Sequence, residues 1–373
     1  MKIETIKTHS NLTRYILVDE LGNPIEPVLR FLKFKDNCGR ARNTLKAYCF
    51  HLKFFYEYLD FTKKQFYEIK IDDLAGFLRW LQNGGGVALN IIKMLPNKPI
   101  RSARTINVYI TTIYEFYGYL IRHEDYRIQL SDNLTKKMSV SQKGFKDFLY
   151  HINKSKYFDA KLLKLKEPKK CIKTISKDDV GKLINACYTT RDKFLIQLLW
   201  ESGMRISEAL SLWLEDIEPD ARIIHIKDRG ELENLAEIKT VCSPRSIDVS
   251  SDLINLYFEY IATAHINEVD TNHVFIKQSG QKKYSPLEYS DVSSLVIRLK
   301  KRTGVNFTPH ILRHTSFSQL RRLGWEVELI QKRAGHAFVQ STYIYLHPDD
   351  NELHKEWSNI EEKMKLNRKG GNR

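Results

Sequence analysis

Apolar residues recur every three or four positions along much of the first third of the chain, which is the spacing of helices with one buried face. The clearest example lies within residues 42–60. Its regularly spaced apolar positions are Leu45, Tyr48, Leu52, Phe55, Tyr56 and Leu59. The same spacing recurs in three further stretches, residues 27–34, 71–82 and 101–123. We therefore predict a small four-helix domain over residues 25–125, preceded by a segment 1–24 with a short strand at residues 14–18.

The pattern changes in the second half of the chain, where strand-like alternation appears between helical stretches. Residues 222–227 and 245–250 alternate apolar and polar side chains, as strands with one buried face do. Helical spacing is found before and after them, in residues 176–188, 191–203 and 252–264. Gly203 is placed to end the second of these helices. We therefore predict a mainly α-helical chain with a small antiparallel β-sheet in a second domain, residues 174–349.

Two basic segments border this second domain. Residues 126–173 contain the lysine-rich stretch KLLKLKEPKK and are predicted to be a linker. Residues 350–373 are predicted to form a C-terminal helix followed by a basic tail. The apolar positions of that helix are Leu353, Trp357, Ile360 and Met364. The acidic residues at its start are Asp349, Asp350 and Glu352, and they favour the helix dipole more than a metal site.

The chain is strongly basic. Among its 373 residues, 60 Lys and Arg outnumber 45 Asp and Glu, which gives a net charge of +15. An excess of this size favours a polyanionic partner, either nucleic acid or an anionic membrane. Because no apolar run approaches the length of a membrane span and no secretory signal precedes the first domain, we expect nucleic acid and no membrane.

The five cysteines are scattered and form no CxxC pair. A set of this kind is typical of a reduced, cytoplasmic protein without a disulfide framework or a zinc knuckle.

Basic side chains mark the starts of two helices predicted within residues 25–125. They are Arg40, Arg42 and Lys46 at one helix, and Arg101 and Arg104 at the other. Isolated charges usually form a solvated surface, but with this net charge they are equally consistent with contacts to DNA phosphates. Both interpretations stay open from the residues alone.

The first candidate chemical motif is SGMRISEALSL. Arg205 and Glu208 are three positions apart and would share one face of a helix, where the carboxylate can hold the guanidinium in one orientation. On this segment alone, a surface ion pair that adds little stability is the favoured interpretation.

The second motif is TPHILRHTS. Thr308 can cap a helix and Pro309 suits its first position, so His310 and Arg313 fall three apart in the first turn. Basic residues at a helix start oppose the helix dipole unless an anion is bound there. We therefore predict a phosphate site at this turn, whereas His314 faces elsewhere and is predicted to be structural.

The third motif is RAGHAFVQSTYIYLH, residues 333–347. Gly335 is placed to end a helix, and His336 follows in the turn. Tyr343 and Tyr345 come after a short segment that can turn once or twice. This segment alone is equally consistent with a packed core and with a nucleophilic tyrosine.

In their order and spacing, these motifs resemble those of the tyrosine recombinases, also called the phage integrase family. The matching residues are Arg205 and Glu208 in Gly-x-Arg-x-x-Glu, His310 and Arg313 in His-x-x-Arg, His336 in Gly-His, and Tyr345 nine residues further on. The four predicted helices are similar to the core-binding domain of that family. The basic N-terminal part and the long linker are similar to transposon-borne members. The resemblance implies a helical core-binding domain followed by a mixed α/β catalytic domain.

The resemblance also implies how the motifs act on a DNA phosphodiester. Arg205 and Arg313 would bind the two non-bridging oxygens, with Glu208 holding Arg205 in place. His310 would donate or shuttle a proton near the same oxygens, and His336 would hydrogen-bond one of them.

The nine-residue interval after His336 selects Tyr345 over Tyr343 as the nucleophile, which would leave a 3′-phosphotyrosyl link and a free 5′-hydroxyl. The family also uses a general-acid lysine on a β-hairpin, and AEIKTVCSPRSIDV is similar to that hairpin. It points to Lys239, while Lys227 stays an alternative because the segment between them is longer than in compact members. Since the link keeps a phosphodiester-type bond, we expect no nucleotide cofactor. The scheme also needs no metal ion, and the catalytic region contains no cluster of carboxylates with metal-ligand spacing.

The resemblance thus predicts a site-specific recombinase that acts on double-stranded DNA as a homotetramer, cytoplasmic and associated with the nucleoid when bound. Accessory recombination proteins are further candidate partners. The last helix would dock on a neighbouring protomer, although its apolar spacing fits packing on its own chain equally well. Two alternatives stay open: a type IB topoisomerase-like nicking-closing enzyme and a catalytically inactive DNA-binding regulator.

Overall fold

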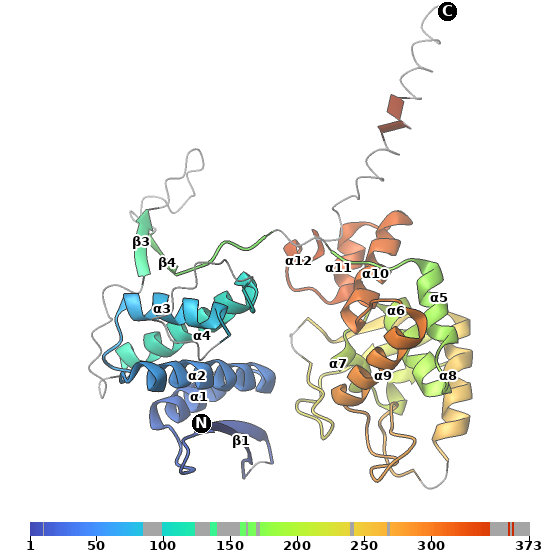
Figure 1. The fold of residues 1–373 in the computed structure, drawn as a ribbon. Coiled ribbons are helices and arrows are strands. Elements are labelled where there is room, and N and C mark those ends of the chain that lie inside the picture. The colour runs from blue at the N-terminus through green and yellow to red at the C-terminus, as the bar shows by residue number, and fades with distance from the viewer. Residues whose placement is uncertain are drawn as a thin grey trace, which may run out of the picture. The chain divides into compact units, whose positions relative to one another are not determined.

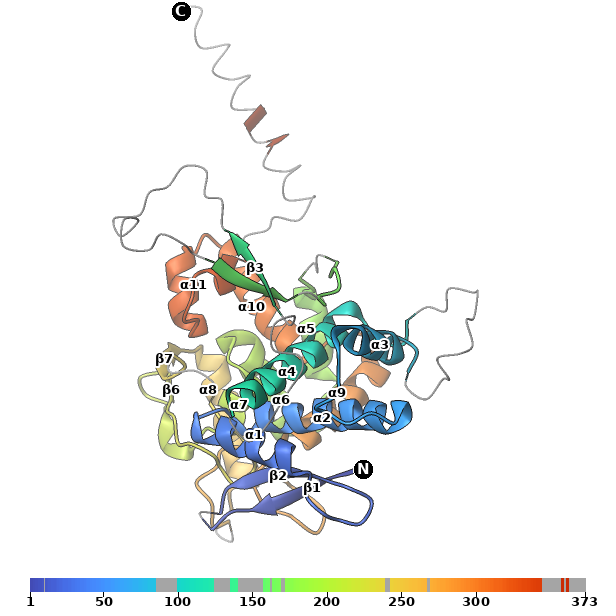
Figure 2. The same cartoon turned by 90° about the vertical axis from the view of Figure 1, so that its left-hand side faces the viewer.

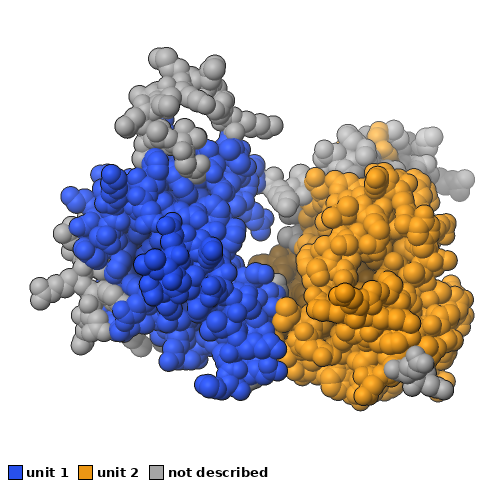
Figure 3. Space-filling view, turned by 60° about the horizontal axis from the view of Figure 1, so that its bottom comes forward, with its two compact units in different colours: residues 1–169 blue, residues 170–373 orange. Residues whose placement is uncertain are grey.

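The structure is a computed structural model that divides into two compact units, residues 1–169 and 170–373, which Figure 3 colours separately. The residues that it describes are 1–9, 11–84, 99–123, 163–168, 172–238, 242–266, 269–343, 357–358 and 360–361, with the backbone alone of 135–139 and 157–161. Each unit has its own cluster of buried apolar side chains. Each therefore has the means to fold around its own core.

Unit 1 contains the four predicted helices (Figure 1), so that prediction is confirmed. They are α1 (Glu26–Asn37), α2 (Arg42–Thr62), α3 (Ile71–Gln82) and α4 (Ala103–Arg122). Aromatic rings fill the space between them. The Phe55 ring of α2 meets Phe77 of α3 at 5.3 Å and Tyr117 of α4 at 5.9 Å, both edge to face. Each such pair adds about 0.5–1.5 kcal/mol beyond its burial, so these rings fix how the helices pack.

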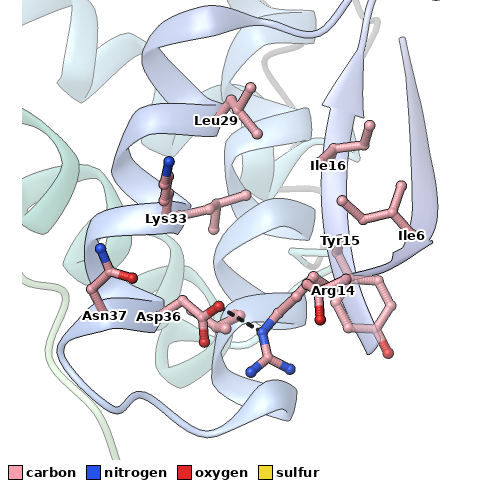
Figure 4. A pocket seen from close by; sticks show the side chains of 11 residues that line it. Ile6, Arg14, Tyr15, Ile16, Leu29, Lys33, Asp36 and Asn37 are labelled. Atoms are coloured by element: carbon pink, nitrogen blue, oxygen red, sulfur yellow. Dashed lines mark hydrogen bonds and ion pairs between the residues drawn. The ribbon is translucent and has the colours of Figure 1, made fainter. Parts of the chain in front are cut away.

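A strand pair precedes these helices. The predicted strand β2 (Thr13–Val18) pairs antiparallel with β1 (Lys2–Lys7), which was not predicted. Nearly all β1 side chains are exposed, so this strand lacks the apolar alternation that would have identified it. A cavity of about 270 Å³ lies between the strand pair and α1, where the Arg14 guanidinium points to the Asp36 carboxylate at 2.7 Å (Figure 4). None of the predicted site residues that the structure describes lines this cavity.

The region predicted as a linker, residues 126–173, contains regular structure of its own. Strands β3 (Thr135–Ser139) and β4 (Tyr157–Lys161) pair antiparallel within it. Further along, the side chain of Asn107 on α4 binds both backbone groups of Leu165. Its amide nitrogen donates to Leu165 O at 2.9 Å, and its Oδ1 accepts from Leu165 N–H at 2.8 Å. This end of the region is therefore held against unit 1.

Unit 2 is mainly helical, as Figure 1 shows. It carries a three-stranded antiparallel sheet of order β5-β6-β7, of which Figure 2 labels β6 and β7. The strands are β5 (Ile217–Glu218), β6 (Ile223–Ile226) and β7 (Arg245–Asp248), with Ile224 opposite Ile247. The helices are α5 (Lys177–Asn185), α6 (Thr190–Ser202), α7 (Ile206–Leu210), the 3-10 turn Leu214–Asp216, α8 (Ser251–Ala264), α9 (Tyr289–Thr303), α10 (Pro309–Arg322), α11 (Val327–Ala334) and α12 (Gln340–Tyr343). The predicted fold class, mainly α with a small antiparallel sheet, is confirmed.

Three predicted helix ends are confirmed, and together they position the candidate site. Thr308 caps α10 by accepting the Ile311 N–H, with Pro309 in the first position. Gly203 ends α6 and Gly335 ends α11, both in the left-handed conformation that glycine adopts at least cost. Helix α6 packs against α10, and α10 packs against α11, so these ends belong to one packed group of helices.

Among the described residues, no helix combines the length and apolar character that crossing a membrane requires. Of the predicted C-terminal helix and tail, residues 350–373, only Trp357–Ser358 and residues 360–361 are described, and they are helical. The apolar positions Leu353 and Met364 lie outside the described residues.

The end of α6 yields a test of packing. Gly203→Ala should lower the free energy of unfolding of unit 2 by about 2–4 kcal/mol, because a Cβ there is strained at φ +66° and would lie 2.6 Å from the Phe317 ring. Gly304→Ala is the matched control: φ is +71° but nothing lies within 4 Å of the added Cβ, so about 1–2 kcal/mol should be lost. Urea denaturation measures both, and equal losses would contradict the Phe317 contact.

Candidate active site

Glu208 lies at the centre of the candidate site. Its Oε2 accepts the backbone N–H of Arg205 at 2.7 Å and so caps the start of α7, while Arg205 Nη1 donates to Oε1 at 2.7 Å. Arg205 therefore precedes the helix, and the pair does not share a helical face as predicted. Glu208 is 1% exposed, so the interpretation as a surface ion pair is wrong.

Two further guanidinium groups converge on Glu208. Arg245, at the start of β7, donates Nη2–H to Oε2 at 3.0 Å and Nη1–H to Oε1 at 3.2 Å. Arg313 of α10 brings Nη1 to 4.0 Å from Oε2. Burial by itself raises the pKa of Glu208, but the hydrogen bond and charge of Arg245 and the charges of Arg205 and Arg313 outweigh it and hold that pKa below its ordinary value. Glu208 is therefore a carboxylate at neutral pH.

Arg313 is a buried cation that is held by helix ends. It is 1% exposed, and it donates to Gly203 O at 2.6 Å and to Ala334 O at 2.7 Å. These carbonyls lie at the C-terminal ends of α6 and α11, where the helix dipole favours positive charge. The Arg313 side chain thus joins the two helix ends that the glycines terminate.

His336 is neutral, and its tautomer follows from its partners. Arg313 Nη2 lies 3.0 Å from His336 Nε2, and a guanidinium can only donate, so Nε2 accepts. The ring proton is then on Nδ1 and is donated to Thr342 Oγ1 at 2.9 Å. Burial, followed by the charges of Arg313, Arg205 and Arg245, lowers the pKa of His336 to about 4. At neutral pH, the three arginines and Glu208 therefore leave two positive charges unbalanced beside an uncharged imidazole.

Position 335 requires a glycine, because a side chain there would collide with its neighbours. A Cβ at this position would lie 2.8 Å from Arg245 Nη1 and 2.9 Å from Cys242 O. Its carbonyl also lies 3.4 Å from Arg205 Nη2, which donates to it. The glycine of the Gly-His motif thus provides both a left-handed turn and room for a guanidinium.

His310 is exposed in the first turn of α10. Its ring meets that of His314 edge to face, with 4.2 Å between the centroids. The prediction that His314 faces elsewhere is therefore wrong, because residues four apart on a helix are neighbours.

Two predicted catalytic residues, Lys239 and Tyr345, lie outside the described residues. Tyr343, the tyrosine that the nine-residue interval does not select, is 51% exposed. Lys227, the alternative general acid, lies 3.1 Å from the buried Asp216 carboxylate and pairs with it.

The predicted DNA contacts of unit 1 differ in exposure. Arg40, Lys46 and Arg104 are exposed. Arg101 is partly buried, and donates to Leu81 O while covering the Phe54 ring. Arg42 is buried and donates to the Tyr15 hydroxyl at 3.3 Å, because its side of α2 packs against β2. The prediction of a phosphate contact for Arg42 is therefore not supported by this structure.

Arg245 is the site residue that was missed. It lies in the predicted hairpin, six positions after Lys239, within the stretch SPRSIDV. The arginine of that stretch was the available signal, but nothing in the sequence pairs it with Glu208, 37 positions away.

Among the described residues, no group of three or more His, Cys, Asp and Glu side chains is arranged to hold a metal ion.

Comparison with known families gives two matches. The model described as "Phage integrase family" matches residues 173–352, and the model described as "Phage integrase, N-terminal SAM-like domain" matches residues 30–124. The first match lies in unit 2 and the second in unit 1.

Curated relatives match almost the whole chain. Transposase A from transposon Tn554 of Staphylococcus aureus is 38% identical over 360 residues, covering 96% of this chain and 97% of the relative. Tyrosine recombinase XerC of Leptospira interrogans is 21% identical over 332 residues, covering 88% of this chain and 89% of the relative.

Among the solved structures that share the fold are a recombinase and an integrase. The XerH recombinase bound to its palindromic difH substrate, a post-cleavage complex, has a TM-score of 0.59 and 19% identity, covering 86% of this chain and 80% of that chain. The Tn1549 transposon integrase in complex with transposon right end DNA has a TM-score of 0.57 and 16% identity, covering 90% of this chain and 99% of that chain.

The neutral His336 predicts a pH dependence of stability. Its folded pKa of about 4 lies below the ordinary 6.5, so between these values the unfolded chain binds more protons than the folded one. The free energy of unfolding should therefore fall as the pH drops from 6.5 towards 4. His336→Gln should lose this part of the slope, as urea denaturation across that range would measure. Parallel curves for the two proteins would contradict a neutral His336.

Proposed function

Because the chain belongs to the phage integrase family of tyrosine recombinases, we propose that it cuts and rejoins DNA at specific sites through a 3′-phosphotyrosyl intermediate. The observation that carries this proposal is the cluster of Arg205, Arg245 and Arg313 around Glu208, with its two unbalanced positive charges. Such a cluster is suited to the charge that develops on phosphate oxygens during in-line attack. Likeness to the Tn554 transposase along nearly the whole chain supports a transposon-borne recombinase.

Two of the guanidinium groups bind the phosphate in this proposal. Arg205 is 24% exposed, so a phosphate can approach it directly. Arg313 is buried, and in this proposal it donates to a phosphate oxygen after one of its present acceptors has moved aside. Of its hydrogen-bond acceptors described above, His336 Nε2 belongs to a side chain that can turn, whereas the others are carbonyls of helix ends. His336 would then hydrogen-bond a phosphate oxygen itself.

Tyr345 is the proposed nucleophile. Thr342 is buried and its hydroxyl is bonded to His336, and Tyr345 follows three residues later. A span of three residues covers at most about 11 Å between Cα atoms, which supports delivery of the Tyr345 hydroxyl to this cluster in the proposed reaction. A phenol has an ordinary pKa near ~10, and neighbouring positive charge favours its ionised form.

Lys239 is the proposed general acid, and His310 assists at the phosphate. Ser243, four residues after Lys239, accepts from Arg205 Nη1 at 3.4 Å, which ties this part of the hairpin to the cluster. Lys227 is bound to Asp216 instead, which favours Lys239 between the two. His310 is exposed at the start of α10, where it can exchange a proton with a non-bridging oxygen.

The proposed step balances without a cofactor. A bond forms from Tyr345 Oη to phosphorus, the bond from phosphorus to the 5′ oxygen breaks, and Lys239 protonates that oxygen. The phenolic proton leaves to solvent or to His310. A 5′-hydroxyl reverses the step on the same or another strand, and no metal takes part in this scheme.

The proposed substrate is double-stranded DNA, bound in part by Arg40, Lys46 and Arg104 of unit 1. Exchange between two sites needs four active sites, so we propose a homotetramer on DNA, with accessory recombination proteins as further partners. Strand exchange between two labelled duplexes distinguishes this function from topoisomerase-like relaxation and from binding without cleavage.

Tyr345→Phe should bind the DNA site but form no covalent adduct, because the attacking oxygen is absent. Tyr343→Phe is the matched control and should form the adduct within about threefold of the unmodified chain, since its hydroxyl takes no part. A nicked suicide duplex with EDTA present, followed by gel shift under denaturing conditions, measures both. An adduct with Tyr345→Phe would refute the nucleophile, and loss of all adduct on chelation would refute the metal-free scheme.

Lys46→Gln should lower the slope of log affinity against log salt by about 1, because one phosphate contact releases about one counterion. Lys64→Gln is the control: Lys64 follows the other end of α2, which lies about 24 Å along the helix from Lys46, and it is already paired with Asp73 at 2.6 Å. Titration of a fluorescent duplex at several salt concentrations gives both slopes. Equal slopes for the two variants would remove Lys46 from the interface.

A further inference from the structure

The Arg245 side chain joins three segments that carry the candidate site. Its Nε–H donates to Arg333 O at 2.6 Å, near the end of α11. Its Nη1 donates to Ser243 O at 2.6 Å, on the approach to β7. Both Nη atoms also donate to Glu208 on α7. The side chain is 8% exposed, so these bonds are largely shielded from water.

We propose that Arg245 is a positioning residue for strand transfer, which holds Glu208 and the turn of His336 in one fixed arrangement. The inference rests on the function proposed above. Arg245 acts through its neighbours, because each of its three guanidinium nitrogens already donates to a protein acceptor. Because Arg245 also holds Glu208, Arg205 and Arg313 are not its only partners. The exposed part of the Arg205 guanidinium then stays available to bind the phosphate.

Only an arginine satisfies this arrangement. One planar guanidinium group makes all four hydrogen bonds, and they point in three directions. A lysine ammonium on a flexible side chain cannot reproduce this geometry. The space is also closed on one side, because a Cβ on Gly335 would lie 3.2 Å from Arg245 Cζ. The guanidinium and the glycine therefore fit each other as a pair.

Arg245 also affects the charge state of His336. Among the described residues, the charged groups that act on this imidazole are Arg313 from α10, Arg205 before α7, Arg245 from β7 and Glu208 from α7. The three arginines oppose protonation of His336 and Glu208 favours it. Removing Arg245 takes away one positive charge and leaves more of the negative charge of Glu208 uncompensated, so the pKa of His336 should rise.

The test compares Arg245→Gln, Arg245→Lys and Arg191→Gln in the full chain. Arg191 is the matched control: it is mostly buried and pairs with Asp192 at 2.7 Å, but lies near the start of α6, about 18 Å along that helix from Gly203. Two quantities are measured: adduct formation on the nicked duplex, and the titration midpoint of His336 by NMR of ¹³C-labelled histidine. The His336 signal is identified by its loss in His336→Gln.

With Arg245→Gln, adduct formation should fall at least about 100-fold and the His336 midpoint should rise by about one pH unit. Arg245→Lys keeps the charge and loses the fork, so its midpoint should stay near that of the unmodified chain while adduct formation falls about 10-fold. If Arg245→Gln does not fold, this lysine variant decides. Arg191→Gln should move neither quantity.

Adduct formation within threefold of the unmodified chain in Arg245→Gln, with an unchanged midpoint, would overturn the proposal. Equal losses in Arg245→Gln and Arg191→Gln would also overturn it, because they would reflect general destabilisation. If the unmodified chain forms no adduct, the proposed function fails. The His336 midpoint would still show whether Arg245 controls this turn.

Discussion

The candidate site depends on one buried carboxylate. Glu208 is almost completely removed from solvent, yet stays ionised because Arg205, Arg245 and Arg313 surround it. A buried carboxylate costs free energy, and it costs still more when it has no partner. Removing either Glu208 or its arginine partners would therefore leave buried charge uncompensated. The three guanidinium groups likewise repel one another and need the carboxylate between them. The carboxylate and the three guanidinium groups therefore stabilise one another in the buried cluster.

Helix ends complete this arrangement. The last carbonyls of α6 and α11 have no partner within their own helices, and Arg313 supplies one to each. Gly203 and Gly335 allow both helices to end abruptly enough for the carbonyls to meet the same guanidinium. A positive charge at two negative helix ends is favourable, which offsets part of the cost of burying Arg313. Secondary structure thus contributes electrostatics as well as scaffolding.

In the proposed function, the two units have different tasks. Unit 2 places its unbalanced positive charge in one buried cluster, where it can act on a single phosphate. Unit 1 has exposed basic side chains at its helix starts, suited to many weak phosphate contacts. His336 belongs to the first arrangement: burial, followed by the surrounding positive charge, lowers its pKa and keeps it neutral.

Much of this protein was predictable from its sequence. Apolar spacing identified the four helices of unit 1 and strands β6 and β7, and the Thr308-Pro309 pair identified the cap of α10, because these depend on neighbours within a few residues. The glycines that end α6 and α11 were found for the same reason. The order of Arg205, His310, Arg313 and His336 also sufficed to recognise the family, although not to establish what each residue does.

Only the tertiary structure decided which of these residues meet. Arg245 and Glu208 are distant in sequence, and Arg42 looked like any other basic residue at a helix start until β2 was seen to cover it. Strand β1 escaped notice because exposed strands need no apolar pattern. Local spacing records which face of an element is buried, whereas the partner of a charged side chain is chosen by long-range packing, and that choice places Arg245 in the site and removes Arg42 from the surface.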